Sequence, residues 1–558
     1  MIQEQLIALI AHAMASAADR MGIGEELPTP ELGAPKKAEH GDFTCNIAMG
    51  LAARANLPPR TVAQAIADAL EPADFVERVE VAGPGFINIF LTNGWLHDVL
   101  TRVLAEGPGY GRAAPNGLRA QVEFVSANPT GPLHVGHARN AVLGDALARL
   151  LEAAGWVVER EYYFNDAGRQ MDQFGLSLEA RYLEVLGRES VMPEDGYFGS
   201  YITDLANDIV GEHGDAFAEL APQDRLARVM AEGARRVLHQ IRATLDRFGV
   251  RFDVFFSEAE LARKGEIAAA EQRLRESGYA YDAEGAVWFR STAFGDDKDR
   301  VIVRSNGAYT YFGADCAYLV DKFSRGFDRM VYVWGADHHG DVMRVKGAAE
   351  ALGLDPDAVE IVLYQFVTFL RGGEPVKMSK RAGTFVSLDE LIDEVGADAA
   401  RFTLLQFSND SAMNFDIEVV KRQTMDNPVY YVQYGHARIA SIVRKAEAGG
   451  MALGSLAEAD LSLLSTRSEL DLLRALADIP EVIANAAAQR APHRLTHAAV
   501  DLAATFHRFY TECRVLDPDQ PALSLSRLWL CAGTKQAIAN LLSIIGVSAP
   551  ASMERADG

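Results

Sequence analysis

The sequence has few cysteines and no long apolar stretch, and each absence argues against a class of protein. Four cysteines occur in 558 residues, and no two of them form a C-x-x-C pair. This spacing argues against structural zinc and against a disulfide framework. No run of about 18 apolar residues occurs, so we expect no contact with a membrane. The plain interpretation is a cytoplasmic protein whose thiols stay free in a reducing compartment.

Two common nucleotide-binding patterns are also missing. The sequence contains neither a G-x-G-x-x-G run nor a Walker loop, which disfavours a dinucleotide enzyme and a P-loop ATPase. The segment from Met1 to Ala18 is rich in small apolar residues, but it lacks an early basic residue and polar side chains interrupt it. We therefore expect a soluble amphipathic helix there rather than a signal peptide.

The charge balance is strongly acidic. With 54 Lys and Arg against 77 Asp and Glu, the formal net charge is −23. Taken alone, this balance argues against binding nucleic acid, because contacts with phosphate dominate that affinity. The local field matters more than the total, however. Basic residues gather in four groups, each of which could instead be a solvated helix face: Arg235, Arg236 and Arg242; Lys377, Lys380 and Arg381; Arg438, Arg444 and Lys445; Arg490, His493 and Arg494.

The chain is long enough for several domains at roughly 150 residues each. Residues 1–110 predict a small α/β or α+β domain, with helices over 2–19, 44–55 and 62–70 and a hairpin or two short strands over 78–91. Residues 115–395 predict a Rossmann-type catalytic domain with a parallel sheet. Its strands are expected at the V-E-F-V, V-I-V-R and M-V-Y-V-W runs (122–125, 301–304 and 330–334), and about 175–290 is expected to be a helical insertion. Residues 396–558 predict an α-helical bundle, and the fold class is therefore α/β.

The segment from Glu123 to Leu151 reads EFVSANPTGPLHVGHARNAVLGDALARLL. Apolar residues at 122, 124 and 125 predict a strand, and the three- and four-residue spacing after Ala138 predicts a helix that ends at Gly155. His134 and His137 stand where that helix starts, and backbone N–H groups and the helix dipole favour an anion there. Histidine donates to phosphate oxygens, and Gly136 lets a phosphate or a flat ring approach the backbone. From this motif alone, a purely structural histidine pair stays open.

A second motif lies far downstream. Lys377-Met378-Ser379-Lys380-Arg381 sits between the glycines 372–373 and 383. Lysines in such a loop suit a polyphosphate, although a solvated basic loop would look the same. In addition, Gly335-x-Asp337 follows a predicted strand, so Asp337 would lie at the carboxyl end of the sheet, where ligands bind. Capping a turn is an equally good reading of Asp337 from spacing alone.

Together and in this order, the two motifs resemble the signature sequences of class I aminoacyl-tRNA synthetases, HIGH and KMSKS. Val135 stands where the first signature has Ile, and Arg381 stands where the second ends in Ser. Within that class, the chain resembles the arginyl-tRNA synthetases. The runs that carry this likeness are 123–132, 252–258, 311–315, 335–340, 396–402 and 427–434. The signature motif comprises Ala127, Asn128, Pro129, Thr130, Gly131, Pro132, Leu133, His134, Val135, Gly136 and His137.

The resemblance implies ATP-dependent ligation of L-arginine to tRNA(Arg) through an arginyl-adenylate, with transfer to the terminal adenosine. It implies catalytic roles for His134, His137, Lys377 and Lys380, and ATP contacts for Gly136, Gly335, Asp337, Met378 and Ser379. It also implies that residues 1–110 contact tRNA and that 396–558 form a DALR-type anticodon-binding domain, with Tyr430, Tyr434 and Arg438 as candidate tRNA contacts. Mg²⁺ is expected to travel with ATP. We expect a monomer with no protein metal site.

The arginine side chain restricts which residues can form its binding pocket. A guanidinium is planar and permanently charged, so it favours a carboxylate in fork geometry. Tyr311 and Asp315 lie four residues apart, hence on one face if that segment is helical. By resemblance they read the guanidinium, while Glu123 and Asn128 hold the α-amino end. The alternative for Asp315 is a helix-surface acid, against which its apolar neighbours argue.

Other classes of function stay open at this point. A small-molecule adenylate-forming enzyme or nucleotidyltransferase would share the H-x-G-H motif, but the helical C-terminal third is surplus to such chemistry. A non-catalytic tRNA-binding relative is disfavoured by the intact histidines and lysines of both motifs. A cysteinyl-type class I enzyme is disfavoured because the cysteine spacing expected for its zinc is missing.

Overall fold

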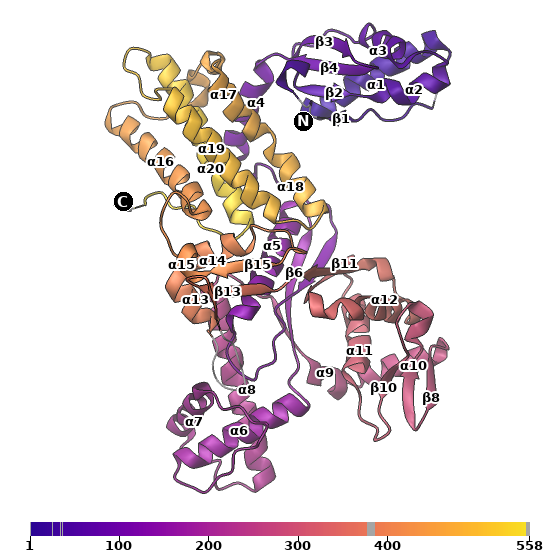
Figure 1. The fold of residues 1–558 in the computed structure, drawn as a ribbon, viewed down its shortest axis with the longest axis vertical. Helices are drawn as coiled ribbons and strands as arrows, with labels where there is room; N and C mark the ends of the chain where they lie inside the picture. The colour runs from indigo at the N-terminus through magenta and orange to yellow at the C-terminus, as the bar shows by residue number, and fades with distance from the viewer. Residues whose placement is uncertain (1, 25, 34, 36, 377–385, 554–558) are drawn as a thin grey trace. The chain divides into compact units, whose positions relative to one another are not determined.

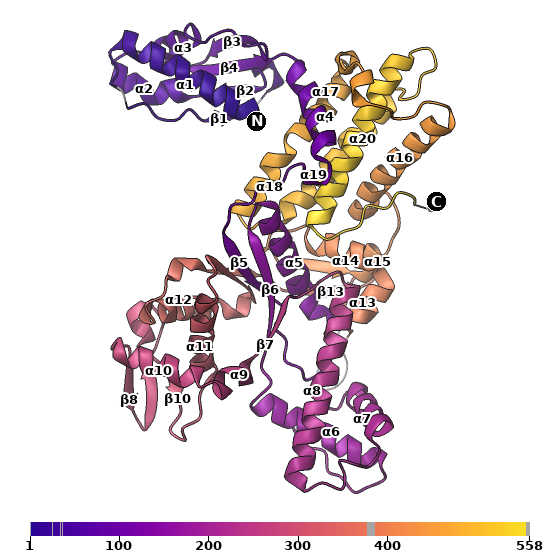
Figure 2. The same cartoon turned by 180° about the vertical axis from the view of Figure 1, so that it is seen from behind.

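The computed structural model describes residues 2–24, 26–33, 35, 37–376 and 386–553. The chain forms two compact units, of which the first comprises 1–107, 442–477 and 505–534 and the second comprises 108–441, 478–504 and 535–558. Figures 1 and 2 show the elements of both units from opposite sides. No described helix is both long enough and apolar enough to cross a membrane.

The N-terminal part of the first unit is a four-stranded antiparallel sheet with three helices packed on it. The strand order is β1-β2-β4-β3, with β1 Leu32–Gly33, β2 Phe43–Cys45, β3 Val76–Ala82 and β4 Phe86–Leu91. The helices are α1 Ile2–Met21, α2 Ile47–Ala55 and α3 Pro59–Ala67. Apolar side chains from α1, α3 and β4 form one buried core, which includes Leu6, Ile10, Val62, Ile66, Ile87 and Ile89.

Two predictions for this part are confirmed and two need correction. The helix over 2–19 and the hairpin over 78–91 are present as α1 and β3–β4. The helix predicted over 44–55 was wrong at its start, because Thr44 and Cys45 pair with β4 and α2 begins only at Ile47. The helix predicted over 62–70 starts earlier, because Pro59 occupies its first turn, where proline is favoured.

The prediction that 396–558 is helical is confirmed for most of its described residues, but β15 Met413–Asp416 departs from it, because it pairs in parallel with β13 Val367–Arg371. The long helices are α16 Pro428–Ala448, α17 Arg467–Ala477, α18 Ile479–Ala488, α19 His493–Glu512 and α20 Pro521–Ile544. Within the first unit, α17 packs on α4, Gly94–Glu106. Within the second, α18 packs on the helix that follows the histidine motif.

The second unit is built on a five-stranded parallel sheet in the order β12-β11-β5-β6-β7. Its strands are β5 Arg119–Glu123, β6 Val157–Phe164, β7 Val254–Ser257, β11 Arg329–Gly335 and β12 Val359–Tyr364. The chain runs outward from β5 in one direction and returns to place β11 on its other side. The order therefore reverses between β5 and β11, and ligands of such sheets bind beside the carboxyl ends of the strands at this switch point.

The interval predicted as a helical insertion is not helical throughout. It holds α6 Arg169–Val185, α7 Ser200–His213 and α8 Pro222–Arg247, but then contributes β7 to the parallel sheet. After α9 Glu258–Arg263 and α10 Glu266–Glu276 follow β8 Ala280–Ala283, β9 Ala286–Phe289 and β10 Arg300–Val303. These three strands form a separate antiparallel sheet, so the prediction that V-I-V-R belongs to the parallel sheet was wrong. A four-residue apolar run does not distinguish the two kinds of sheet.

Three helices pack near the parallel sheet and position the site: α5 Ala138–Ala153, α11 Tyr311–Ser324 and α12 Val342–Ala351. A further small sheet, β14-β13-β15, has β13 Val367–Arg371, β14 Glu374–Pro375 and β15 Met413–Asp416. The remaining short helices are α13 Leu388–Val395, α14 Ala397–Leu404 and α15 Ile417–Val420. The predicted capping box at the start of α13 is confirmed, because the side chains of Ser387 and Glu390 each bond the other's backbone N–H.

A buried arginine ties distant segments of the second unit together. Arg401 on α14 is 1% exposed and forms an ion pair with Asp145 on α5. Its guanidinium also donates to the carbonyl of Phe248 at 2.9 Å and to that of Ile545 at 3.1 Å. Removing one partner of such a buried pair is far more destabilising than removing a surface pair. Arg401 therefore fixes α5, the end of α8 and the chain after α20 in one arrangement.

Candidate active site

The carboxyl end of β5 leads into the histidine motif through a strained turn. Val125 and Ser126 have φ angles of 65° and 44°, in the left-handed region that a β-branched residue rarely adopts. Asn140 on α5 holds this turn, because its Oδ1 accepts from the Val125 N–H at 2.5 Å and its Nδ2 donates to the Val333 carbonyl at 2.9 Å. The Asn140 side chain thus joins the ends of β5 and β11 at the switch point.

The two histidines form a short 3-10 turn ahead of α5. Their ring centroids are 4.0 Å apart. The Nδ1 of His134 accepts from the Gly136 N–H at 3.1 Å, and the Nδ1 of His137 accepts from the His134 N–H at 3.2 Å. Since Nδ1 is the acceptor in both rings, a neutral ring carries its proton on Nε2. Each imidazole can therefore present an Nε2–H donor to an anion at the start of the helix.

One cavity of about 820 Å³ opens at this switch point. Residues predicted to be catalytic or to bind ATP line this cavity together with residues predicted to bind arginine. They are Glu123, His134, Gly136, His137, Tyr311, Asp315, Gly335 and Asp337. Gly335 ends β11 and Asp337 follows it, so the predicted position at the carboxyl end of a strand is confirmed. Asn128 instead lines a neighbouring cavity of about 650 Å³. The predicted Lys377, Met378, Ser379 and Lys380 lie outside the described residues.

Asp315 is one of four acidic residues that line this cavity, with Glu123, Asp337 and Asp341. The segment from Tyr311 is helical, as predicted, so the two side chains share one face of α11. Burial raises the pKa of Asp315 to about 7, and repulsion from Glu258 and Glu123 adds to the rise. A carboxylate that is costly to ionise alone becomes favourable once a cation enters beside it. Tyr311 also lines this cavity and is 56% exposed.

Comparison with known proteins agrees with this geometry. The family model for the catalytic domain of class I (R) tRNA synthetases matches residues 99–440, that for the arginyl tRNA synthetase N-terminal domain matches 4–91, and that for the DALR anticodon binding domain matches 432–553. The chain belongs to the arginyl-tRNA synthetase family.

Relatives and solved structures of this family resemble the chain over nearly its whole length. An arginine–tRNA ligase of Moorella thermoacetica is 48% identical over 99% of this chain and 100% of its own. One from Listeria monocytogenes is 45% identical over 99% and 100%. The crystal structure of the Thermus thermophilus arginyl-tRNA synthetase, at 24% identity, superposes with a TM-score of 0.75 over 99% of this chain and 100% of that one. This last likeness concerns the fold.

Sequence reasoning missed the partner of Glu123. Glu123 is buried, and its carboxylate accepts from the Lys322 ammonium at 2.6 Å and from the Ser126 hydroxyl at 3.1 Å. Lys322 is fully buried and lies 3.7 Å from the centroid of the Tyr332 ring. Glu123 therefore already has a cation partner, and a ligand's amino group would have to share it. The only hint in the sequence is that Lys322 follows Asp315 by seven residues, on the same helix face.

Sequence reasoning also missed Glu258 and Tyr163. Glu258 opens α9 directly after β7, within the family-like run 252–258, and the Tyr163 hydroxyl donates to its carboxylate at 2.6 Å. Burial raises the pKa of Glu258, while this hydrogen bond opposes the rise. Repulsion from Glu258 is the largest charge effect on the pKa of Asp315. Glu258 itself lines an adjacent cavity, so its charge acts on Asp315 without contributing to the wall of the cavity that holds the two histidines.

The predicted tRNA contacts on α16 form a stacked row. The rings of Tyr430 and Tyr434 lie 6.1 Å apart at 12°, and Arg438 donates to the Tyr434 hydroxyl at 2.9 Å. Tyr430 is only 7% exposed. A base would therefore reach Tyr434 and Arg438 more readily than Tyr430, whose ring is mostly covered.

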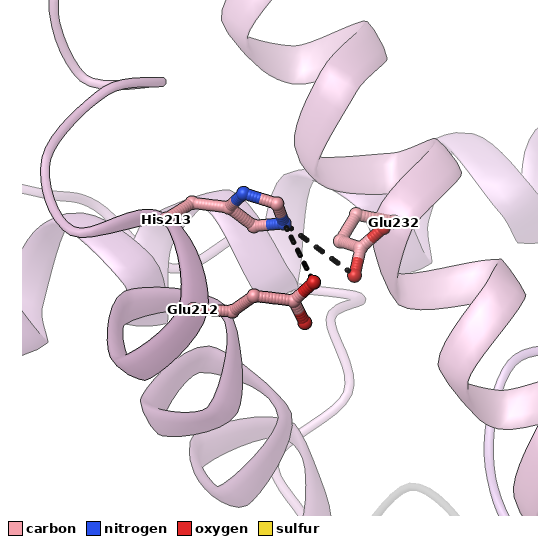
Figure 3. Close-up of side chains that lie close together, drawn as sticks. All are labelled: Glu212, His213 and Glu232. Atoms are coloured by element: carbon pink, nitrogen blue, oxygen red, sulfur yellow. Dashed lines mark ion pairs between the residues drawn. The ribbon is translucent and has the colours of Figure 1, made fainter.

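A cluster of possible metal ligands lies away from the cavity, in the helical insertion (Figure 3). His213 Nε2 lies 3.9 Å from Glu212 and 3.7 Å from Glu232. Both carboxylates are already engaged, because Arg235 pairs with Glu232 at 2.6 Å and Arg236 pairs with both. This cluster is an ion-pair network between α7 and α8, and it also neutralises one of the basic groups noted in the sequence.

Proposed function

We propose that this protein ligates L-arginine to tRNA(Arg), consuming ATP and forming an arginyl-adenylate. The observation that carries the proposal is that the carboxyl group of Asp315 lines the same cavity as the two histidines. A planar cation and a triphosphate are the two ligands that such a cavity suits best. Family membership over almost the whole chain supports the same reaction.

In the first step, a carboxylate oxygen of arginine attacks the α-phosphorus of ATP, and the bond to the pyrophosphate oxygen breaks. The attacking group is already ionised at pH 7, so no general base is needed. Catalysis then consists of positioning and charge stabilisation. His134 and His137 donate to the α-phosphate oxygens, and Asp337, two residues after Gly335, accepts from the ribose hydroxyls. Gly136 leaves room for the nucleotide beside the backbone.

The leaving pyrophosphate gains negative charge as the bond breaks. Lys377 and Lys380, with Met378 and Ser379 between them, are proposed from the sequence to follow the β- and γ-phosphates. Mg²⁺ bound to ATP would further neutralise the negative charge of the phosphates. In the second step a ribose hydroxyl of the terminal adenosine attacks the arginyl carbonyl, and AMP leaves.

The enzyme binds both the guanidinium and the α-amino group of arginine. Asp315 and Tyr311 take the guanidinium, and Asn128 with Glu123 takes the α-amino group. Citrulline and lysine should fail, because each leaves Asp315 without a bidentate cation. Residues 1–110 and 396–558 are proposed to contact the tRNA, the latter through Tyr434 and Arg438. We propose that the enzyme acts as a monomer, and sedimentation of the purified protein tests its oligomeric state. We also propose that it acts in the cytoplasm.

The deciding experiment is charging of tRNA with a panel of amino acids. We expect arginine alone to be esterified, and preference for lysine or glutamine would refute the assignment. Exchange of labelled pyrophosphate into ATP, with and without tRNA(Arg), tests the adenylate. Exchange that does not depend on arginine would contradict the proposed intermediate.

A further inference from the structure

An arginine two residues after the second histidine of the motif is buried. Arg139 is the second residue of α5 and is 2% exposed. Its guanidinium donates to three backbone carbonyls, those of Gln365 at 2.6 Å, Ser411 at 2.8 Å and Ser408 at 2.9 Å. The side chain thus joins the start of α5 to the residue that follows β12 and to the loop that precedes β15.

Arg139 forms no ion pair with a carboxylate among the described residues. Asp410 acts on it only at longer range, because Asp410 is exposed and accepts from the Ser408 hydroxyl instead. Burying a guanidinium without a carboxylate costs free energy, which three neutral acceptors offset only in part. Burial lowers the pKa of Arg139, but a guanidinium stays ionised in proteins. The protein therefore holds a full positive charge at the start of α5.

This charge lies close to the cavity that the two histidines line. Gln365, whose carbonyl accepts from Arg139, lies in the chain between Tyr364 and Phe366, and both of these line the cavity. Asn140, the next residue of α5, lines it too, and its amide donates to the Tyr364 hydroxyl at 3.4 Å. Because Arg139 is almost fully buried, its field reaches the cavity through protein and is screened less than that of a surface charge.

The described lining of this cavity is acidic. Four acidic residues line it against two arginines, Arg300 and Arg344. Both arginines already pair with Asp296, and Arg344 also pairs with Asp341. Acidic walls repel the phosphates of a nucleotide. A positive charge on the side of the histidines is therefore needed to bring phosphates there, and Arg139 supplies one.

We propose that Arg139 is a positioning residue whose buried charge draws the phosphates of ATP to the two histidines. His134 and His137 direct individual phosphate oxygens through their Nε2–H groups, whereas Arg139 attracts the phosphates without touching the nucleotide. The start of α5 adds a partial positive charge of the same sign. This inference rests on the proposed function and adds to it a residue that contacts no substrate.

The test uses ligands that differ only in their phosphates. Adenosine, AMP, ADP and ATP share one nucleoside, and calorimetric titration at one ionic strength, with magnesium chelated, gives their dissociation constants. In Arg139→Met the affinity for adenosine should stay within about twofold of wild type, because adenosine carries no charge. AMP should bind several-fold more weakly and ATP at least about tenfold more weakly, since one buried charge changes the affinity for an anion by roughly this factor. A purely structural role for Arg139 would instead weaken all four ligands equally.

Three further variants make the result specific. Arg139→Lys keeps the charge, so the ratio of its affinities for ATP and adenosine should stay within about twofold of the wild-type ratio. Arg139→Gln removes the charge but keeps N–H donors, so it should behave as Arg139→Met, and it takes the place of that variant if the methionine form does not fold. Arg251→Met, at a side chain that is 86% exposed, is the control and should bind all four ligands as wild type does.

The outcomes separate this inference from the proposed function. An equal loss of affinity for all four ligands in Arg139→Met or Arg139→Gln would overturn the inference. So would a ratio of ATP to adenosine affinity that falls as far in Arg139→Lys as in the two neutral variants. Either result leaves the proposed function standing, whereas a wild-type protein that binds no ATP refutes the proposed function itself.

Discussion

Replacing Asp315 by asparagine should weaken arginine binding and yet stabilise the protein without its ligands. In the folded protein, burial raises the pKa of this carboxyl from 3.8 to about 7. The folded state therefore binds more protons than the unfolded state between these values, so the free energy of unfolding falls as pH rises through this window. The full loss is at most about 4 kcal/mol, since each unit is worth about 1.4 kcal/mol.

The expected outcome has opposite signs for stability and for binding. At pH 8 Asp315→Asn should unfold at a higher denaturant concentration than wild type, and the difference should vanish as pH falls toward 4. Arginine affinity should fall about a hundredfold at pH 8, because a charge-assisted pair worth about 3 kcal/mol is lost. In wild type, affinity for arginine should increase with pH up to about 7, since only the ionised form pairs with a guanidinium.

Calorimetric titration with arginine and denaturant unfolding, each at pH 5, 6, 7 and 8, measure the two effects. Asp208→Asn, at an exposed position on α7, is the matched control and should change neither. A variant that binds arginine weakly but is no more stable than wild type at pH 8 would refute the reasoning. Ionising the buried Asp315 carboxyl group would then not lower the free energy of unfolding. The same conclusion follows if arginine affinity of Asp315→Asn still varies with pH as in wild type.

Three other changes test separate parts of the structure. Arg401→Met should cost about 3 kcal/mol in denaturant unfolding, because it leaves Asp145 buried without its nearest cation. Asn140→Ala should cost about 1–3 kcal/mol and lower kcat more than it raises KM, because the left-handed turn at Val125 loses its hydrogen bond. Zinc and chelators should leave the melting temperature unchanged, because the carboxylates beside His213 already pair with arginines.

Each of these has a clear contrary result. Arg467→Met is the control, because its side chain is 91% exposed, and it should change the free energy of unfolding by less than about 0.5 kcal/mol. If Arg467→Met lost as much stability as Arg401→Met, the loss in Arg401→Met could not be assigned to the buried pair with Asp145. A kcat of Asn140→Ala equal to that of wild type would show that the turn at Val125 does not depend on this hydrogen bond. A melting temperature that rises with stoichiometric zinc would contradict the view of the His213 cluster as an ion-pair network.

Local patterns in the sequence predicted the parts of the site that depend on neighbours in the chain. The turn and helix around His134 and His137, the common face of Tyr311 and Asp315, and the place of Asp337 after a strand all follow from short-range periodicity. Each of these is set by the backbone within a few residues, so one sequence suffices to find it.

Most of the missing parts depend on partners far apart in the chain. Lys322 meets Glu123 across 199 positions, and Asn140 meets the Val333 carbonyl across 193. No local pattern encodes such distances. The left-handed Val125 was missed for a related reason, since its side chain favours an extended strand and only tertiary contacts override that preference. The antiparallel pairing of β10 was missed because its partner, and not its own composition, decides the sheet.

The reach of Arg401 has a consequence for substitutions far from the cavity. Its guanidinium contacts Asp145 on α5, the carbonyl of Phe248 and the carbonyl of Ile545. A change that shifts the segment around Ile545 therefore also disturbs the helix that follows the two histidines, because one buried side chain serves both. Remote packing mutations of this kind should lower turnover without altering any group that meets a substrate.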